Sequence, residues 1–162
     1  MSRSRGKVVD RDRGWKKFRA RGKELSKQPG VTVGLHAAEG GKQHKAGNDR
    51  GPPLTVLDVG TIHEFGLGLP ERSFIRAWFD AAKPENYALA HRMLVRVMLG
   101  QISVEDALNQ MGAYFAGQIQ LFIAQNKVQP PDRPTTIAIK GSSTTLIDKD
   151  QLRQSLTWKI AK

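Results

Sequence analysis

The middle of the chain has the sequence Ile62-His63-Glu64-Phe65-Gly66-Leu67-Gly68, which continues as Leu69-Pro70-Glu71-Arg72-Ser73-Phe74. The spacing of apolar residues before Gly66 predicts a helix over residues 54–65, which the two glycines end. Pro70 begins a turn, and Ser73 has a side chain preferred at the N-cap of a second helix, over residues 74–82. This stretch therefore predicts two short helices joined by a turn.

Two longer helices are expected after this turn. Pro84 is favoured in the first turn of a helix, and a helical pattern then extends over residues 85–99 until Gly100. Ser103 and Asp106 form a capping-box pattern that begins the longest helix, over residues 103–126. Its apolar stripe keeps the helical period throughout, and consists of Ala107, Leu108, Met111, Tyr114, Phe115, Ile119, Phe122 and Ile123.

Strand patterns occur near both ends of the chain. Residues 31–37 are rich in β-branched side chains, whereas residues 136–140 and 156–160 alternate in the way that strands do. A helical turn is expected over residues 148–153. The chain is therefore predicted to be an α+β protein, in which a small antiparallel sheet of about three strands carries several helices on one side.

Positive charge is concentrated at the N-terminus. Residues 1–30 carry eleven Lys and Arg against three Asp and Glu, which is +8 of the net charge of +11. Residues 10–26 fit a helix whose narrow apolar stripe contains Trp15, Phe18 and Leu25, so we expect it to dock on the body or on a neighbouring subunit. The chain thus divides into a basic arm, residues 1–30, and one α+β domain, residues 31–162. Such an arm suits a nucleic acid or an acidic protein surface, and equally a solvated tail.

A long loop is predicted between the first strand and the first helix of the body. Residues 39–53 contain several Gly, two adjacent Pro and few apolar side chains. Loops of this length are usually functional or disordered. We therefore expect a mobile projection that becomes ordered on contact with a partner, with Lys42, Lys45 and Arg50 as its interface candidates.

Residue types that carry chemistry do not occur at catalytic or metal-binding spacings. The chain has no cysteine, which excludes disulfides and thiolate metal sites and fits synthesis in a reducing cytoplasm. His63 and Glu64 lack the second His, four residues on, that a zinc-protease helix needs, because that position is Leu67. The favoured interpretation is that His63 and Glu64 form hydrogen bonds at the end of a helix. We therefore expect no enzyme activity, no cofactor and no metal.

Five short patterns follow one another in a fixed order along most of the chain. They are Val31-Thr32-Val33-Gly34-Leu35, Ile62-His63-Glu64-Phe65-Gly66, residues 69–76, Leu146-Ile147-Asp148, and Gln151-Leu152-Arg153-Gln154-Ser155-Leu156-Thr157. In this order they resemble the virion-morphogenesis proteins of tailed bacteriophages, a neck or minor-tail-component group that includes tail-completion and tail-terminator proteins. The likeness covers about residues 31–160. It departs from the family after Asp148, where a Thr-Gly pair is usual and this chain has Lys149-Asp150.

The resemblance implies a structural role in the virion. Identical subunits would form a ring, which we expect to be a hexamer, between the capsid connector and the tail tube or terminator, with double-stranded DNA in its lumen. The protein would be located in the neck or tail after assembly in the bacterial host cytoplasm. It would need no membrane, since no apolar run approaches the about 18 residues of a membrane span. The basic arm is expected outside the channel, because a strongly basic lumen would hold the DNA.

The resemblance also suggests two kinds of site residue. The expected structural anchors are Phe65, Gly66, Pro70, Phe74 and Leu152. The expected interface or salt-bridge residues of the body are Arg72, Arg76 and Arg153. Replacing Arg72 by Glu is expected to weaken assembly while the monomer stays folded.

The basic arm keeps a second hypothesis open, that of a DNA-binding protein whose arm contacts phosphates. Such a protein would bind duplex DNA with a steep dependence on salt. Against it, the body shows no recognisable helix for reading bases. The sequence leaves open whether a neck protein of this kind completes or terminates the tail, and whether that tail is contractile.

Overall fold

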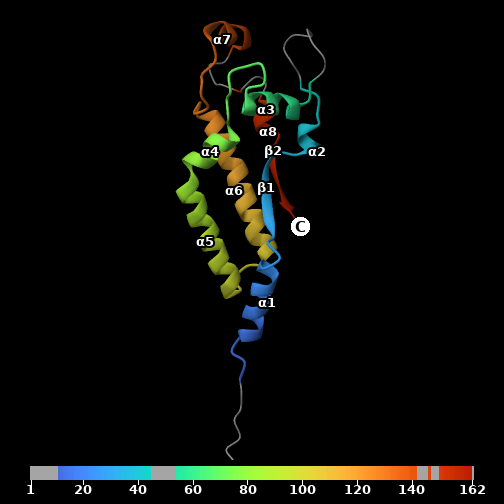
Figure 1. Cartoon of the computed structure of the whole chain (residues 1–162), viewed down its shortest axis with the longest axis vertical. Coiled ribbons are helices and arrows are strands. Elements are labelled where there is room, and N and C mark those ends of the chain that lie inside the picture. The colour runs from blue at the N-terminus through green and yellow to red at the C-terminus, as the bar shows by residue number, and fades with distance from the viewer. Residues whose placement is uncertain (1–10, 45–53, 142–145, 147–149, 162) are drawn as a thin grey trace, which may run out of the picture.

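The computed structural model of the chain describes residues 11–44, 54–141, 146 and 150–161. This part of the protein contains eight helices and a two-stranded antiparallel sheet, so the predicted α+β class is confirmed (Figure 1). The elements are, in chain order, α1 (Trp15–Leu25), β1 (Gly30–Leu35), α2 (Ala37–Gly40), α3 (Val56–Phe65), α4 (Ile75–Ala81), α5 (Lys83–Leu99), α6 (Val104–Ala124), α7 (Pro134–Lys140), α8 (Gln151–Gln154) and β2 (Leu156–Ala161).

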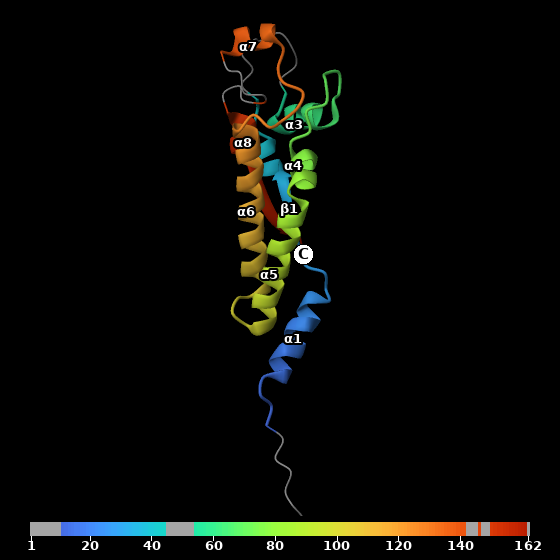
Figure 2. The same cartoon turned by 90° about the vertical axis from the view of Figure 1, so that its left-hand side faces the viewer.

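The molecule is elongated, with different elements at its two ends. Helices α5 and α6 form an antiparallel pair along the long axis, and the two strands lie beside α6 (Figures 1 and 2). The short helices α3, α7 and α8 gather at one end, whereas α1 projects from the other. Any partner therefore meets two chemically distinct ends.

The sheet joins the segment that follows α1 to the C-terminal end of the described chain. Strand β1 pairs with β2 in antiparallel register, with Val33 opposite Trp158. One face of the sheet packs on α6 at Gly112, where an added Cβ would lie 2.4 Å from Trp158 Cδ1 and 2.8 Å from Val31 Cγ2. A side chain at position 112 would therefore hold α6 away from the sheet.

Two hydrophobic clusters lie one above the other along α6. The larger lies toward the end with α3 and α8, and its buried members are Val56, Phe74, Trp78, Ile119, Ile123, Val128, Leu152 and Leu156. The smaller lies toward α1, and its buried members are Val97, Val104, Ala107 and Leu108. Because α6 contributes to both, it connects the two ends of the molecule.

The helix boundaries in the body follow the signals in the sequence. Thr55 caps α3 in a reciprocal capping box with Asp58, and Ser103 accepts a hydrogen bond from the Asp106 amide at the start of α6. Gly66 and Gly100 end α3 and α5 with positive φ angles of 67° and 76°, a conformation that glycine adopts without steric cost. The predicted helices over residues 54–65, 85–99 and 103–126 are thus confirmed within one or two residues.

The prediction of a strand over residues 136–140 is wrong, and with it the prediction of about three strands. These residues belong to α7, which begins at Pro134 and ends before Gly141 in a left-handed conformation. Proline is favoured in the first helical turn and glycine just after the last one, so these two end signals outweigh the β-branched residues between them.

The predicted loop over residues 39–53 is also shorter than expected at its start. Glu39 lies in α2, and Gln43 forms an isolated antiparallel bridge with Thr55. The Lys42 carbonyl accepts a hydrogen bond from the Val56 amide at 3.0 Å, so backbone contacts close the base of this segment. The expected projection at its tip falls on residues 45–53, outside the described residues.

The contact between Gly112 and the sheet predicts a position-specific effect. Gly112→Ala should lower the free energy of unfolding by about 1–3 kcal/mol, because the methyl group overlaps Trp158. Gly117→Ala on the same helix is the control, since nothing lies within 4 Å of its Cβ position. It should gain up to about 1 kcal/mol from helix propensity. Urea unfolding measures both variants, and equal effects at the two positions would contradict the close packing.

Candidate functional site

The carboxylate of Glu64 joins the two motifs in the middle of the chain. It lies at the end of α3, is 5% exposed, and receives hydrogen bonds from the start of α4. The Phe74 and Ile75 amides donate to Oε2 at 2.8 and 3.1 Å, and the Ser73 hydroxyl donates to Oε1 at 2.8 Å. Glu64 thus accepts hydrogen bonds from amides at the N-terminus of α4, which the side chain of the N-cap residue does not pair. The prediction that Ser73 is the N-cap is therefore wrong by one residue, since the N-cap of α4 is Phe74. The Ser73 hydroxyl instead donates to Glu64 and accepts from the Ala77 amide.

Arg76 extends this network toward the surface. Its Nε lies 3.2 Å from Glu64 Oε1 and its Nη2 lies 2.9 Å from Glu71 Oε1. The guanidinium also lies over the ring of Phe65, 5.0 Å from the ring centre, which is a cation–π geometry. Arg76 is therefore held on three sides by its own chain, although half of its side chain is exposed.

Arg72 ties the same region to the segment that follows α6. Its side chain is buried, with Nη2 3.1 Å from Asp132 Oδ1, and its Nε donates to the Pro130 carbonyl at 3.1 Å. Its backbone amide donates to the His63 carbonyl at 2.8 Å. We call Glu64, Arg72, Ser73, Arg76 and Asp132 the clasp, because together they fix the corner between α3 and α4.

The pKa of Glu64 reflects this arrangement. Burial acts to raise the pKa, but hydrogen bonds from the Ile75, Arg76 and Phe74 amides and from the Ser73 hydroxyl outweigh it. The pKa of Glu64 is therefore held below its ordinary value, and the carboxylate stays ionised inside the protein. An ionised, fully hydrogen-bonded carboxylate is suited to holding backbone in place rather than to accepting a proton from a substrate.

The C-terminal motif packs against the same corner. Leu152, in α8, is 3% exposed and belongs to the same cluster as Val56 and Phe74. Arg153 makes an ion pair with Asp150, and hydrogen bonds from Arg153 lower the pKa of that aspartate. Motifs that lie far apart in the sequence therefore meet in one structural unit at one end of the molecule.

The structure places the predicted anchor residues in two groups. Phe74 and Leu152 are buried, and Gly66 makes the left-handed turn after α3, where a Cβ would lie 3.0 Å from Glu71. Phe65 is 57% exposed and Pro70 is exposed as well, so these two do not anchor the core as expected. The reason is that α3 turns its last residue outward, where the Phe65 ring supports Arg76.

The predicted interface residues of the body are mostly engaged within the chain. Arg72, Arg76 and Arg153 all make intramolecular ion pairs. Arg72 is in addition buried, so its role as an interface residue is corrected to an internal one. Lys42 is exposed at the base of the predicted loop, whereas Lys45 and Arg50 lie outside the described residues.

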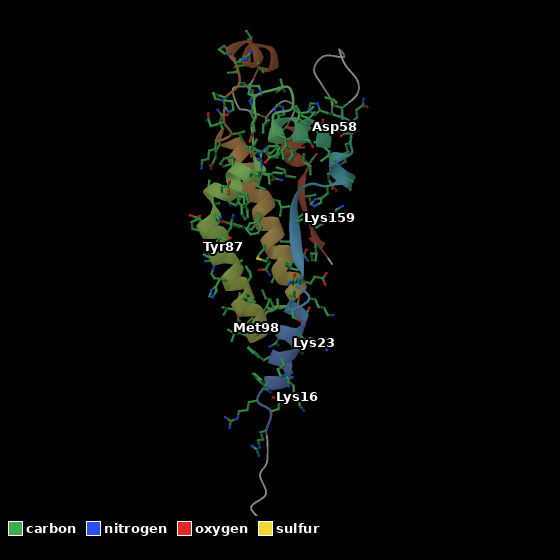
Figure 3. All side chains as sticks on the ribbon, viewed as in Figure 1. Lys16, Lys23, Asp58, Tyr87, Met98 and Lys159 are labelled. Carbon is green, nitrogen blue, oxygen red and sulfur yellow. The ribbon has the colours of Figure 1, made fainter. Side chains whose placement is uncertain are left out.

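Helix α1 carries an exposed aromatic pair on a basic helix. The rings of Trp15 and Phe18 stack with centroids 5.6 Å apart, and their side chains are 63% and 44% exposed. The other end of α1 is docked: Leu25 packs on the smaller cluster, and Arg21 Nη1 donates to the Met98 carbonyl at the end of α5 at 3.2 Å. In Figure 3, Lys23 lies at about the height of Met98 along the long axis, whereas Lys16 lies further toward the free end of α1. The predicted docking of the arm thus applies only to its last turns.

An apolar groove lies between β1 and α4, with α6 as its floor. Its volume is about 430 Å³, and it is lined by Val31, Val33, Ile75, Arg76, Trp78, Phe79, Asp80, Phe115 and Ile119. Phe79 is 45% exposed at its rim. No pattern in the sequence indicates this groove, because its walls come from three separate segments and Phe79 has the spacing of an ordinary helix residue.

Two further findings concern the described residues alone. Among residues 11–44, 54–141, 146 and 150–161, no group of three or more His, Asp or Glu side chains is arranged to hold a metal ion. Within the same residues, no helix combines the length and the apolar character needed to cross a bilayer.

The clasp predicts a pH-dependent contribution from Glu64. Its lowered pKa stabilises the fold fully above the unfolded pKa of about 4.5, and this contribution is lost as the pH falls through the lower pKa of the folded state. Glu64→Gln should therefore lose about 2–3 kcal/mol at pH 7, and less below pH 4.5. Urea unfolding between pH 3 and pH 7 measures the difference. Glu105→Gln, at an exposed position of α6, is the control, and a deficit that does not change with pH would contradict the role of the charge.

The buried ion pair predicts that Arg72 is needed for folding. Arg72→Met should lower the free energy of unfolding by about 3–5 kcal/mol, because it removes the guanidinium that pairs with the buried Asp132. Arg72→Glu should be worse still, which reverses the expectation of a folded monomer. Arg92→Met, on the exposed side of α5, is the control and should change stability by less than about 0.5 kcal/mol. Thermal unfolding decides, and a stable Arg72→Glu monomer would contradict the burial of this pair.

Comparisons with family models, with curated proteins and with solved structures found no match to this chain.

Proposed function

We propose that this protein is a structural subunit of the head–tail neck of a tailed bacteriophage, of the tail-completion or tail-terminator kind. The observation that carries the proposal is the convergence of the motifs on which the family resemblance rests. Residues 62–66, 69–76 and 151–157 are separated along the chain, but they meet around Glu64, Phe74 and Leu152. The motifs that carry the resemblance thus pack together in one part of the fold.

The use of polar residues supports a structural role. Glu64, Arg72 and Arg76 are the residues of these motifs that would serve best in catalysis, and all three are engaged in ion pairs within the chain. Glu64 caps a helix and Arg72 is buried. The motifs therefore account for a fixed corner in the fold without requiring a substrate.

The shape of the molecule suits a subunit of a ring. Identical subunits close into a ring when each offers two different surfaces that match head to tail. Here the clasp and α7 lie at one end and the basic helix α1 at the other, as Figure 2 shows. We expect a hexamer whose lumen lets double-stranded DNA pass, and whose neighbours are the capsid connector and the tail tube.

A specific observation keeps DNA binding as the second candidate. Helix α1 has basic residues on most of its surface, and its first turns project away from the body (Figure 1). Lys16, Lys17, Arg19 and Lys23 are exposed there and available to phosphates. Contacts of this kind weaken steeply with salt, because each phosphate contact releases counterions from the DNA.

The first experiment is the mass of the protein in solution by light scattering, alone and with purified tail tubes. A closed multimer, or a monomer that forms a ring only on tubes, would support the neck proposal. A monomer that ignores tubes and binds duplex DNA with a steep salt dependence would favour the second candidate.

Charge reversal on α1 separates the two candidates. Lys17→Glu with Lys23→Glu should reduce binding to tail tubes, because the arm is proposed to hold acidic neighbouring proteins. Lys83→Glu with Lys127→Glu is the control, since it changes the net charge equally at exposed positions of the body. Binding to tubes is measured by co-sedimentation, and retention on duplex DNA by titration with salt. Unchanged tube binding together with a loss of DNA retention in the α1 variant alone would contradict the placement of the arm.

A further inference from the structure

We propose that the exposed aromatic pair of α1, Trp15 and Phe18, inserts into the apolar groove between β1 and α4 of a second copy of this chain. The proposal rests on the proposed ring, and it names the contact that would hold neighbouring subunits together. One chain presents both halves of the contact: an exposed aromatic pair on α1, and an apolar groove in the body.

The aromatic pair of α1 is largely exposed to solvent. Trp and Phe side chains can each bury about 150–250 Å² and dominate the energetics of interfaces. In α1 the two rings contact each other, while the buried clusters of the described chain include neither of them. Aromatic residues with this exposure, surrounded by charged residues, are typical anchors of protein contacts.

The groove of the same subunit is out of reach of this pair. Arg21 and Leu25 fix the last turns of α1 at the end of α5, and the helix runs from there away from the body, as both views show (Figures 1 and 2). Trp15 stands ten residues before Leu25, which is about 15 Å along a helix axis. The pair therefore does not reach the groove of its own subunit, whereas the groove of a second copy is open to it.

The groove has the chemistry to accept a basic aromatic helix. Its floor and walls offer aliphatic and aromatic side chains, among them Trp78, Phe79 and Phe115. Asp80 is exposed at its rim and has no ion-pair partner among the described residues. Arg76, the cation at the rim, is already paired with Glu64 and Glu71. A lysine beside Trp15, such as Lys16, thus finds an exposed carboxylate next to the apolar groove.

The contact joins unlike surfaces, so it propagates from subunit to subunit. The helix of one copy enters the groove of the next, which leaves the helix of that next copy free for a third. Contacts of this head-to-tail kind close into a ring when the rotation per subunit divides the circle.

Cysteine cross-linking tests the contact directly, because the chain has no cysteine of its own. Phe18→Cys and Phe79→Cys are made in separate full-length chains, at two exposed positions whose replacement should not unfold the protein. The two variants are mixed and oxidised, alone and on tail tubes, and the linked peptides are identified by mass spectrometry. Lys17→Cys mixed with Phe79→Cys is the control, because Lys17 lies on another face of α1.

The expected result is a disulfide between positions 18 and 79 of different chains, at least fivefold more abundant than the one between positions 17 and 79. No such disulfide, or equal amounts from the two mixtures, would overturn the proposal. If the 18–79 disulfide forms in solution but the protein does not bind tail tubes, the contact is supported and the neck function is contradicted. Rings on tubes without the disulfide would do the reverse.

A second experiment measures the assembly of two variants, each of which lacks one side of the head-to-tail contact. Trp15→Ser with Phe18→Ser removes the inserted pair, and Phe79→Lys blocks the groove. Each variant alone should stay monomeric under conditions where the unchanged chain assembles. Mixed in equal amounts, they should form dimers and nothing larger, because one intact pair and one intact groove remain. Full-size assemblies from either variant alone would overturn the proposal.

Discussion

The Glu64 carboxylate is the constraint on which the rest of the structure depends. An ionised carboxylate inside a protein is costly unless hydrogen bonds and a cation compensate it. Here backbone amides of α4, a hydroxyl and Arg76 supply that compensation, and they can do so only if α4 begins where it does. The start of α4 in turn places Phe74 and Trp78 in the larger cluster. The polar corner and the apolar core are therefore mutually dependent.

Helix α6 transmits this arrangement along the molecule. Its far half packs Ile119 and Ile123 against the corner, and its near half packs Ala107 and Leu108 against α5. Between them, Gly112 brings the helix axis close to the sheet, which covers one face of a pair of strands that would be only marginally stable alone. The groove lies where α4 and β1 flank Phe115 and Ile119 of this helix.

The features that the sequence predicts well are those with local signals. Gly66 and Gly100 mark helix ends through their backbone preferences, and Ser103 does so through a side chain that accepts a hydrogen bond from the Asp106 amide. The apolar stripe of α6 has the helical period. The partners of Glu64 could not be predicted, because no local pattern indicates that a carboxylate will cap a helix ten residues later. Arg72 and Phe65 were misjudged for the same reason: burial depends on which way a helix end turns in three dimensions. The groove could not be predicted either, because its walls depend on how β1, α4 and α6 are placed relative to one another.

The pairing of β1 with β2 has a consequence for the order in which the fold can form. Thr32 and Lys159 stand opposite each other although they are 127 residues apart in the sequence. A ribosome therefore makes β1 long before it makes the strand that completes the sheet, and closing so long a segment slows folding. Until then Val31 and Val33, which line the groove, lack the strand that holds them in place. The apolar groove is thus completed only near the end of synthesis. An incomplete chain therefore has no complete groove to bind another subunit.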